Sequence, residues 1–479
     1  MRIHNLLRAV VVLACWLGNM AAAQASHLLG AELAYDYAGT PAAPHRYHVT
    51  ARLSTDATNG GPTAIPNSIA LNCNATGCTN GAGSFVATLP LSSFQRQFTG
   101  CNNSGLLYYL VVLDGLVDLP PAQWKLSIDL MTRVLGIYNV QQSSATSIYV
   151  STELNNSSGL VNFSPRFTTS HLIYLTSGQP QRYSLSAFDP DGDSLTYQLV
   201  QPLGGSRAPL PCELPTVGAL APHFLLDRFT GELRTSGSSQ RGVFALAVQV
   251  AEYRRLGGSW QLIGNVLRDL AYYSTSATNH RVPDFTGVAP TGNPGRQLLG
   301  QPIPATAGQL LDLTLTAIDS TASLALTVSS DAVGIVPGLA FRNLGNGQGQ
   351  LLWQVPATLS PGRYTFTATV FDNGCPVLGH SVLTLTFVVA QPLGTAAARQ
   401  ALLQPPYPTP FVEEVRFQLA SVGPQAVTIT DATGRVVAQL RSAPDGRVRW
   451  QPAASVAGGL YFARSSDGRQ VARLAYAGH

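Results

Sequence analysis

The chain has 479 residues, of which 45% are hydrophobic, so it is long enough for three or four domains with packed cores. Only 11% of its residues are charged, while glycine (45) and proline (32) are abundant, a composition that favours strands and turns over helices. The net charge of +4 comes without a basic stripe or cluster, which argues against nucleic acid as a partner.

The first 25 residues have the pattern of a secretory signal peptide. Arginines make the start positive, residues 9–17 form a short apolar core, and small residues precede a cleavage point expected between Ala25 and Ser26. A membrane anchor is the competing interpretation, but the apolar run is roughly half the ~20 residues that span a bilayer. No later segment is long and apolar enough to span a bilayer, so we expect no transmembrane span in the mature chain.

Residues 26–160 alternate between apolar and polar positions in several short runs, which predicts an N-terminal β-sandwich-like domain. Three cysteines of this domain, Cys73, Cys78 and Cys101, could form one disulfide in an oxidising exterior, and the sequence leaves open which pair forms. Cys212 and Cys375 lie in later domains, where they could be free or bridge domains.

Two further segments, 161–280 and 281–391, share one pattern and predict an internal repeat. In each copy an alternating run leads to an aspartate, Asp189 in the first and Asp319 in the second, and a second alternating run follows. Repetition of one seven-strand pattern predicts tandem β-sandwiches of about 110 residues each. We expect these sandwiches to follow one another as the spacers of a rod.

An acidic turn is the strongest candidate site. Asp189, Asp191 and Asp193 lie within five residues, and Glu252 is the best candidate for a further ligand because it matches Asp372 in the second copy. Calcium takes six to eight oxygens, and alternate carboxylates on a glycine-containing turn can supply about three of them. The alternative is a plain turn whose carboxylates cap backbone amides and face water.

Sequence signatures of catalysis are missing: the chain has no Gly-x-Ser-x-Gly, His-Glu-x-x-His or phosphate-loop motif. We expect Arg268 and Asp269 to form an intradomain salt bridge or a turn rather than a ligand contact. If the first domain binds carbohydrate, an exposed aromatic platform is required, and Tyr108, Tyr109 and Trp124 are the candidates, each with a core position as the alternative.

The last segment, 405–479, follows a linker at 392–404 and predicts a small β-sandwich. Three runs occur in it in order: Tyr407-Pro408-Thr409-Pro410-Phe411, residues 429–437 and residues 458–464. Together they resemble the C-terminal sorting domain of type IX secretion substrates, although Thr409 stands where that family usually has Asn. The resemblance implies export through the outer membrane of a Bacteroidetes-type cell, with the following motif residues: Tyr407, Pro408, Pro410, Gly434, Gly459 and Tyr461.

Two other stretches carry resemblances. The opening residues 26–35, with Leu154-Asn155-Asn156 and residues 162–167, resemble a group of large Bacteroidetes surface proteins, many described as gliding-motility-related or adhesin-like. Residues 187–197 resemble the acidic segment of cadherin-like or immunoglobulin-like bacterial repeats.

These observations predict an all-β secreted or cell-surface protein without catalytic activity, exported by type IX secretion, with a role in adhesion or surface structure and possible ties to gliding or biofilm matrix. Its expected partners are the secretion machinery and a surface glycan or other surface proteins, and calcium is its expected cofactor. The alternatives are a carbohydrate-binding protein that supports polymer capture and, after it, a hydrolase of unrecognised chemistry.

Overall fold

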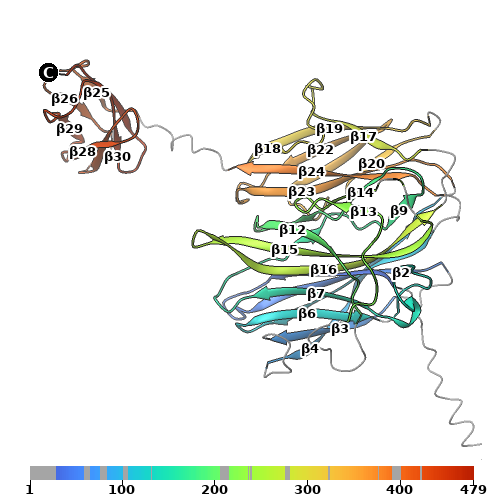
Figure 1. Ribbon diagram of the computed structural model, residues 1–479. Helices are drawn as coiled ribbons and strands as arrows, with labels where there is room; N and C mark the ends of the chain where they lie inside the picture. Colours follow the sequence, from blue (N-terminus) through green and yellow to red (C-terminus); the bar gives the residue numbers. More distant parts are fainter. Residues whose placement is uncertain are drawn as a thin grey trace, which may run out of the picture. The chain divides into compact units, whose positions relative to one another are not determined.

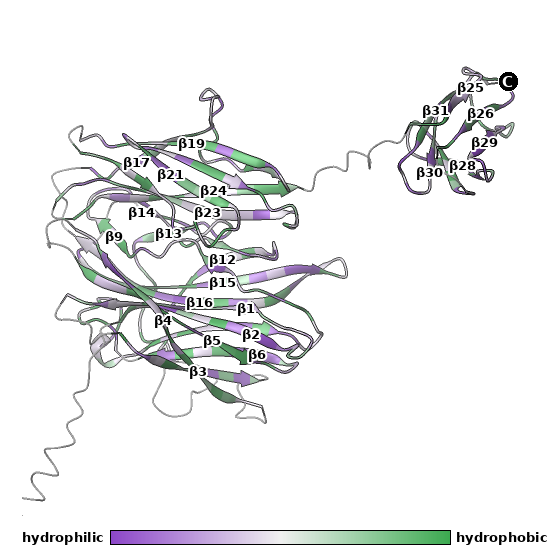
Figure 2. Cartoon of the chain, turned by 180° about the vertical axis from the view of Figure 1, so that it is seen from behind, coloured by the Kyte–Doolittle hydropathy of each residue, from purple (hydrophilic) through white to green (hydrophobic). Residues whose placement is uncertain are grey.

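The computed structural model describes residues 28–58, 65–75, 83–100, 106–130, 132–204, 215–235, 237, 240–275, 281–321, 324–375, 377–390, 401–420 and 423–478. Within these ranges the regular elements are β-strands and one 3-10 turn, η2 (Ser143–Ala145). The predicted all-β fold is confirmed. Hydrophobic and hydrophilic bands alternate along many strands in Figure 2, as strands with one buried face require. The chain divides into two compact units, 1–390 and 391–479.

A large curved sheet begins the first unit (Figure 1). Its strand order is β1-β2-β5-β4-β3-β6-β7, and all neighbouring pairs are antiparallel. Along β2, Tyr47, Val49, Ala51 and Leu53 are buried and alternate with more exposed positions. The seven strands are β1 (Leu28–Tyr37), β2 (Arg46–Asp56), β3 (Ser68–Ala75), β4 (Phe85–Phe98), β5 (Leu107–Asp118), β6 (Gln123–Leu130) and β7 (Ile148–Asn155).

The sheet closes on a strand from further along the chain, β16 (Ser259–Thr275). Strand β15 (Gly242–Leu256) pairs with one edge of β16 along nearly its whole length. The other edge pairs in turn with β7, with β1 and with the parallel strand β9 (Ile173–Thr176). At the contact with β1, a Cβ on Gly30 would lie 3.0 Å from the Cβ of Leu270, so the glycine permits the close approach. Strands from both sides of the predicted domain boundary at 160/161 therefore belong to one continuous hydrogen-bonded sheet.

The first unit has three bodies: the large sheet and two β-sandwiches, which we call the second and the third sandwich. These two sandwiches have the same strand order, which confirms the predicted tandem repeat. One sheet runs β9-β16-β15-β12 in the second sandwich and β18-β24-β23-β20 in the third, and in both the first pair is parallel. The facing strands are β8, β11, β10, β14 and β13 in the second sandwich, and β17-β19-β22-β21 in the third.

The remaining strands of the second sandwich are β8 (Arg166–Phe167), β10 (Arg182–Ser184), β11 (Ala187–Phe188), β12 (Ser194–Val200), β13 (Phe224–Leu226) and β14 (Glu232–Thr235). Those of the third are β17 (Asp284–Pro290), β18 (Ile303–Thr306), β19 (Leu310–Ile318), β20 (Thr327–Ser329), β21 (Leu339–Gly345), β22 (Gln348–Gln354), β23 (Gly362–Phe371) and β24 (His380–Ala390).

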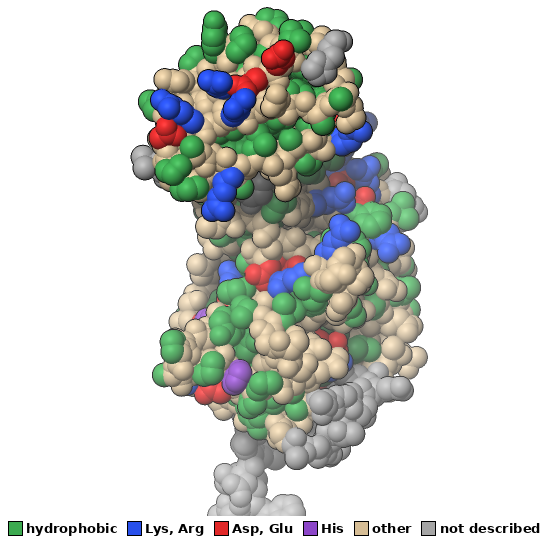
Figure 3. Space-filling model, turned by 90° about the vertical axis from the view of Figure 1, so that its left-hand side faces the viewer, with side chains coloured by type: hydrophobic (Ala, Val, Ile, Leu, Met, Phe, Trp, Pro, Cys, Tyr) green, Lys and Arg blue, Asp and Glu red, His purple; other side chains and the backbone are tan. Residues whose placement is uncertain are grey.

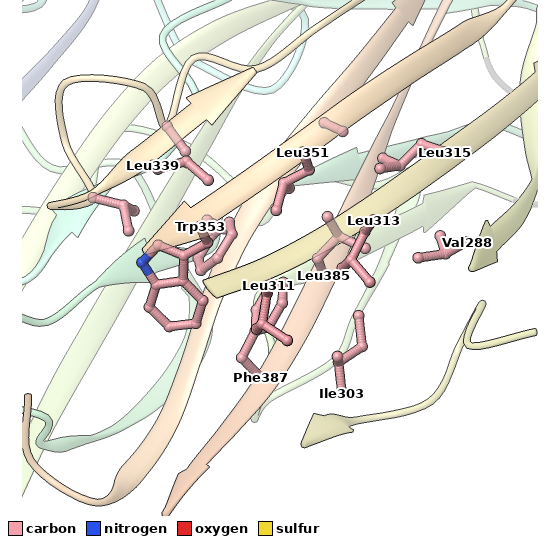
Figure 4. Packing of buried hydrophobic residues seen from close by; sticks show 14 of the residues in the cluster. Val288, Ile303, Leu311, Leu313, Leu315, Leu339, Leu351, Trp353, Leu385 and Phe387 are labelled. Atoms are coloured by element: carbon pink, nitrogen blue, oxygen red, sulfur yellow. The ribbon is translucent and has the colours of Figure 1, made fainter. Parts of the chain in front are cut away.

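The core of the third sandwich shows why its alternating runs form strands. Leu311, Leu313 and Leu315 of β19 point inward with Trp353 and Phe387 (Figure 4). Trp353 has no exposed surface, its ring lies 5.1 Å from that of Phe387, and its indole N–H donates to the carbonyl of Pro337 (3.1 Å). The indole is thus both packed and hydrogen-bonded, as a buried Trp requires.

The third sandwich packs beside the second, so the predicted rod of successive spacers is wrong. Three threonine hydroxyls of β23 and β24 bond to the second sandwich: Thr365 to the carbonyl of Ala187 (3.2 Å), Thr367 to that of Thr168 (2.7 Å) and Thr384 to the hydroxyl of Ser184 (2.7 Å). Threonine on the outer face of a strand satisfies a hydrogen bond there while its methyl group packs, so this face suits burial against another sheet.

Buried ion pairs join the first sheet to β16. Arg133 donates to both oxygens of Asp269 (2.9 and 2.6 Å), and the two side chains are 1% and 0% exposed. Arg268 pairs with Glu32 of β1 (3.0 Å). Arg268 and Asp269 do form salt bridges, but both partners lie in the predicted first domain, so the expected intradomain pairing is wrong.

The cysteines differ from the expectation. Cys73 is a free, buried thiol in the first sheet, and burial raises its pKa to about 12. It is therefore removed from the candidate disulfide, while Cys78 and Cys101 lie outside the described residues. Cys375, which the sequence left open, is disulfide-bonded.

The second unit is a small two-sheet sandwich. Its sheets run β25-β26-β29 and β28-β27-β30-β31. Apolar side chains from both sheets enclose Trp450 and Phe411, which are 2% and 1% exposed. The strands are β25 (Gln404–Tyr407), β26 (Val415–Gln418), β27 (Ala426–Asp431), β28 (Val436–Arg441), β29 (Arg447–Trp450), β30 (Gly459–Ser465) and β31 (Val471–Tyr476).

Candidate functional site

The acidic turn between β11 and β12 forms the base of the candidate site. Gly192 has a φ of +81°, which glycine adopts without strain, and its N–H bonds to the carbonyl of Asp189 (3.3 Å). Oδ1 of Asp189 accepts the N–H groups of Asp191 (2.9 Å) and Asp193 (3.0 Å). This oxygen caps two backbone amides, as the plain-turn interpretation predicts.

Arg254 of β15 joins the turn to the start of the second body. Its guanidinium donates to Asp193 (2.8 Å from Nε) and Asp191 (2.7 Å from Nη2). The same Nη2 reaches Oδ1 of Asn162 (2.6 Å). Sequence reasoning missed Arg254. The available signal was its position two residues after Glu252, a spacing that places side chains on one face of a strand.

Glu252 completes the cluster from β15. It is 1% exposed, and neither of its carboxylate oxygens accepts a hydrogen bond. Oδ2 of Asp189, which is 3% exposed, also has no partner. A Cβ on Gly264 of β16 would lie 2.7 Å from Oε2 of Glu252, so this glycine leaves room for the carboxylate. Three buried oxygens are therefore unpartnered in one place, a costly arrangement unless a ligand or protons compensate it.

The electrostatics of the cluster reflect this crowding. Burial, followed by the charge of Asp193, raises the pKa of Asp189 to about 7. Burial and the charge of Asp189 raise the pKa of Glu252 well above its usual value. Burial also raises the pKa of Asp191. Four carboxylates face one guanidinium, so full ionisation leaves three uncompensated negative charges.

The four predicted carboxylates fit a divalent cation. Asp189, Asp191, Asp193 and Glu252 each offer an oxygen, and these oxygens lie within 4.8 Å of one another. Calcium–oxygen distances of about 2.3–2.6 Å allow two ligands of one ion to be at most about 5 Å apart. The donor set is all oxygen, which suits calcium rather than zinc or copper. These four residues would hold the ion, and the unpartnered oxygens of Asp189 and Glu252 would be its innermost ligands.

The site lies where all three bodies of the first unit meet. Asn162 donates to the hydroxyl of Tyr35 on β1 (2.9 Å), which connects the cluster to the first sheet. From the third sandwich, the hydroxyl of Tyr364 would lie 2.3 Å from a Cβ at Gly192. A cation bound here would contact the second sandwich directly and restrain its junctions with both neighbours.

The matching aspartate of the third sandwich has a different role. Oδ1 of Asp372 accepts the N–H groups of Gly374 (2.9 Å) and Gly379 (2.7 Å), so it caps the β23–β24 loop.

The residues of the predicted sorting motif are distributed over the second unit. Tyr407 on β25 is 78% exposed, and Pro408 and Pro410 are exposed beside it. Gly434 lies in the β27–β28 turn with a φ of +88°. Gly459 and Tyr461 lie on β30, where Tyr461 packs against Trp450 with a ring separation of 5.2 Å. Ala25 and Ser26, the predicted cleavage residues, lie outside the described ranges.

The predicted aromatic platform is not on the surface. Tyr108 and Trp124 are each 2% exposed, and the Trp124 indole donates to the carbonyl of Pro120 (2.7 Å). Tyr109 is half-buried and packs edge to face against Phe94. The core alternative is therefore correct for Tyr108 and Trp124. An exposed tryptophan occurs instead at Trp260 on β16.

Comparisons with known proteins give a distant likeness only. No protein-family profile and no curated protein matches the sequence. Similar solved structures include a fragment of three immunoglobulin domains of titin (10% identity, TM-score 0.19, 66% of this chain and 98% of that chain). Others are the N-terminal eight immunoglobulin domains of Down Syndrome Cell Adhesion Molecule (12%, 0.21, 90% and 47%) and extracellular domains 3–5 of Drosophila OTK (10%, 0.17, 65% and 97%). TM-scores of this size do not establish a common fold, so the fold class rests on the strand orders above.

No helix formed by the described residues has the length and apolar character needed to cross a bilayer.

Proposed function

We propose that this chain is a secreted or cell-surface protein without catalytic activity, of the adhesion or surface-structural class. In this proposal a calcium ion holds its three β bodies together at their common junction. The observation that carries the proposal is the set of buried, unpartnered oxygens of Asp189 and Glu252 at that junction. Extracellular calcium sites work with dissociation constants of about 10⁻⁴–10⁻³ M, so a site with a competing arginine is adequate outside the cell.

A structural role is favoured over hydrolysis by the exposure of the carboxylates. Glycoside hydrolysis needs two carboxyl groups that both reach the substrate. A groove of about 390 Å³ lies beside the cluster, and of the four clustered acids only Asp189 lines it. Glu252 is only 1% exposed. Incubation of the protein with polysaccharides should therefore release no reducing sugar.

The test of the structural proposal is calcium-dependent association. The purified protein should bind to itself or to cells in calcium, and binding should disappear with chelator. Glu252→Gln removes a ligand charge while keeping the side-chain shape, so it should abolish the calcium response. Asp118→Asn is the matched control, because Asp118 is an exposed carboxylate (59% of its side chain) that pairs with Arg46. Calcium-independent association in all three proteins would contradict the proposal.

We further propose export by the type IX secretion system after cleavage of a signal peptide, in a cell of the Bacteroidetes type. Two features support this route: the sorting motif at Tyr407 to Phe411, and the separation of 391–479 as its own compact unit. Deletion of residues 405–479 should leave the protein in the periplasm. Unchanged display of the deleted protein on the cell surface would overturn the route.

A further inference from the structure

A groove of about 390 Å³ lies between the second and third sandwiches, beside the candidate metal centre. Its walls come from the acidic turn and β12, the β15–β16 hairpin, the loop after β13 and the start of β23. The volume falls within the range of about 300–1,000 Å³ that is usual for small-molecule sites. The groove is distinct from the acidic cluster, because only one of the four acids, Asp189, lines it.

Two exposed aromatic rings line the groove. Trp260 is 63% exposed and Phe229 is 52% exposed. Trp260 lies near the tip of the β15–β16 hairpin, where it pairs with Arg255 and follows the Gly257-Gly258 turn. The guanidinium of Arg228 lies 5.0 Å from the centre of the Phe229 ring and restrains it.

The exposure of Trp260 contrasts with the other tryptophans of the described chain. Trp124, Trp353 and Trp450 are between 0% and 2% exposed. A large aromatic ring left in water is an unused contact surface, because it buries much area on binding at low entropic cost. On the face shown in Figure 3, hydrophobic side chains lie exposed between groups of Lys, Arg, Asp and Glu side chains.

Polar groups accompany these rings. The exposed side chains of Ser194 and Arg363 lie on the walls, and Asp189 lies at the base. A sugar ring presents one face of C–H groups, which stacks on an indole, and a rim of hydroxyls, which bond to such polar groups. We infer that this groove binds a neutral glycan, with one sugar ring stacked on Trp260. This inference rests on the proposed adhesion function and names the ligand class for it.

Two other ligand classes fit less well. An added peptide strand needs a free sheet edge, but the outer edge of β12 is occupied where the N–H of Tyr197 bonds to the carbonyl of Arg228 (2.8 Å). A polyanion is disfavoured because the acidic cluster lies at the base of the groove and Arg363 is the one basic side chain among its lining residues. A neutral ligand avoids this charge conflict.

The groove shares the acidic turn with the metal centre. Asp189 and Gly192 line the groove, and Asp189 also supplies an unpartnered oxygen to the cluster. A cation that fixes the turn therefore also fixes one wall of the groove. Glycan binding should weaken when calcium is removed, although the stacking surface of Trp260 remains.

The test uses acrylamide quenching of tryptophan fluorescence in the purified protein, because Trp260 is the exposed tryptophan of the described chain. Soluble neutral glucan, mannan, xylan and galactan are the probes. One of them should protect Trp260 from quenching. In isothermal titration calorimetry, which does not depend on the indole, Trp260→Ala should bind that polysaccharide about tenfold or more weakly. Phe94→Ala is the control, since Phe94 is 52% exposed, like Phe229, but lies on β4 away from the groove.

The outcomes separate this inference from the proposed function. Absence of protection by all four polysaccharides, or equal binding by Trp260→Ala, overturns the glycan site. If calcium-dependent association with cells persists in either case, the adhesion proposal stands without it. Association that survives periodate treatment of the cells but not protease treatment identifies a protein ligand and also overturns the glycan site. Loss of both glycan binding and association in the wild-type protein overturns both proposals.

Discussion

Arg133 and Asp269 are almost fully buried, yet both are charged groups that water would otherwise solvate. Four of the five N–H groups of the guanidinium are hydrogen-bonded, because Nε donates to the carbonyl of Ser147 (2.9 Å) and Nη2 to that of Leu203 (3.1 Å) in addition to the two bonds to the carboxylate. A buried pair of this kind adds little net stability when intact, but removal of one partner leaves the other charge unpaired in the interior.

Arg133→Met should therefore destabilise the first unit strongly, by about 3–5 kcal/mol, since it strands the carboxylate of Asp269. The measurement is the midpoint of urea unfolding followed by circular dichroism. Arg46→Met is the control, because the Arg46–Asp118 pair is exposed to solvent and should contribute little. An equal midpoint for the wild type and Arg133→Met would show that Asp269 finds another partner.

At the same scale, the sequence predicted Asp189, Asp191 and Asp193 because they alternate on one glycine-containing turn. It predicted Glu252 because that position matches Asp372 in the second copy. It did not predict Arg254, since a single arginine on a strand carries no signal of which turn it reaches. It also placed the aromatic platform at Trp124, because residue type shows that a ring is hydrophobic but not whether it is exposed. Exposure of Trp260 follows from the length of a hairpin that extends past its sheet neighbours.

At the scale of elements, the acidic turn of the second sandwich packs closely against the third. Gly192 faces β23, and a Cβ there would lie 2.3 Å from the hydroxyl of Tyr364 and 3.0 Å from the Cβ of Ser360. That hydroxyl in turn donates to the carbonyl of Ser360 (2.8 Å). The turn is therefore fixed by its neighbour as well as by its own hydrogen bonds.

Gly192→Ala should lower the temperature of thermal unfolding for two reasons: a left-handed backbone costs about 1 kcal/mol with a Cβ, and the new methyl group meets Tyr364. Gly178→Ala measures the backbone cost alone, since Gly178 has a φ of +88° and a Cβ there meets nothing within 4 Å. Differential scanning calorimetry should show the larger loss for Gly192→Ala. Equal losses would mean that Tyr364 moves aside freely.

The sequence predicted where strands form, but it did not predict that β16 pairs with strands of the first sheet. The alternation in β19 has a period of two and leads directly to a strand with one buried face. The pattern of β23 also predicts a strand, but this strand is buried on both faces. Nothing in the residues of β16 shows that its second edge pairs with β1 and β7, because edge pairing depends on backbone groups that every residue has. For the same reason the side-by-side packing through Thr365, Thr367 and Thr384 was not foreseen.

At the scale of the whole molecule, the acidic cluster links stability to pH. The pKa of Asp189 is about 7 in the folded chain against an ordinary 3.8, and that of Glu252 is also raised. Without a divalent cation, the folded state therefore holds more protons than the unfolded state between these two values. The free energy of unfolding should fall as the pH rises through this window, and the raised pKa of Glu252 adds to the fall.

Calcium should reverse that loss, because it binds the deprotonated carboxylates. Calcium at about 100 times its dissociation constant should add about 2.7 kcal/mol above pH 7 and progressively less as protons displace it at lower pH. Thermal unfolding at pH 5, 6, 7 and 8, with calcium and with chelator, measures both trends. Glu252→Gln should flatten both, and a calcium effect of equal size at pH 5 and pH 8 would contradict this linkage.

The pairing of Gly30 with Leu270 has a consequence for biogenesis. During synthesis from the N-terminus, β1 and β7 emerge from the ribosome long before β16, so two strand edges stay open in the interval. Folding intermediates with open edges invite pairing with other chains. The nascent first sheet is thus a natural client for chaperones, and a fragment that ends before β16 would be prone to aggregate.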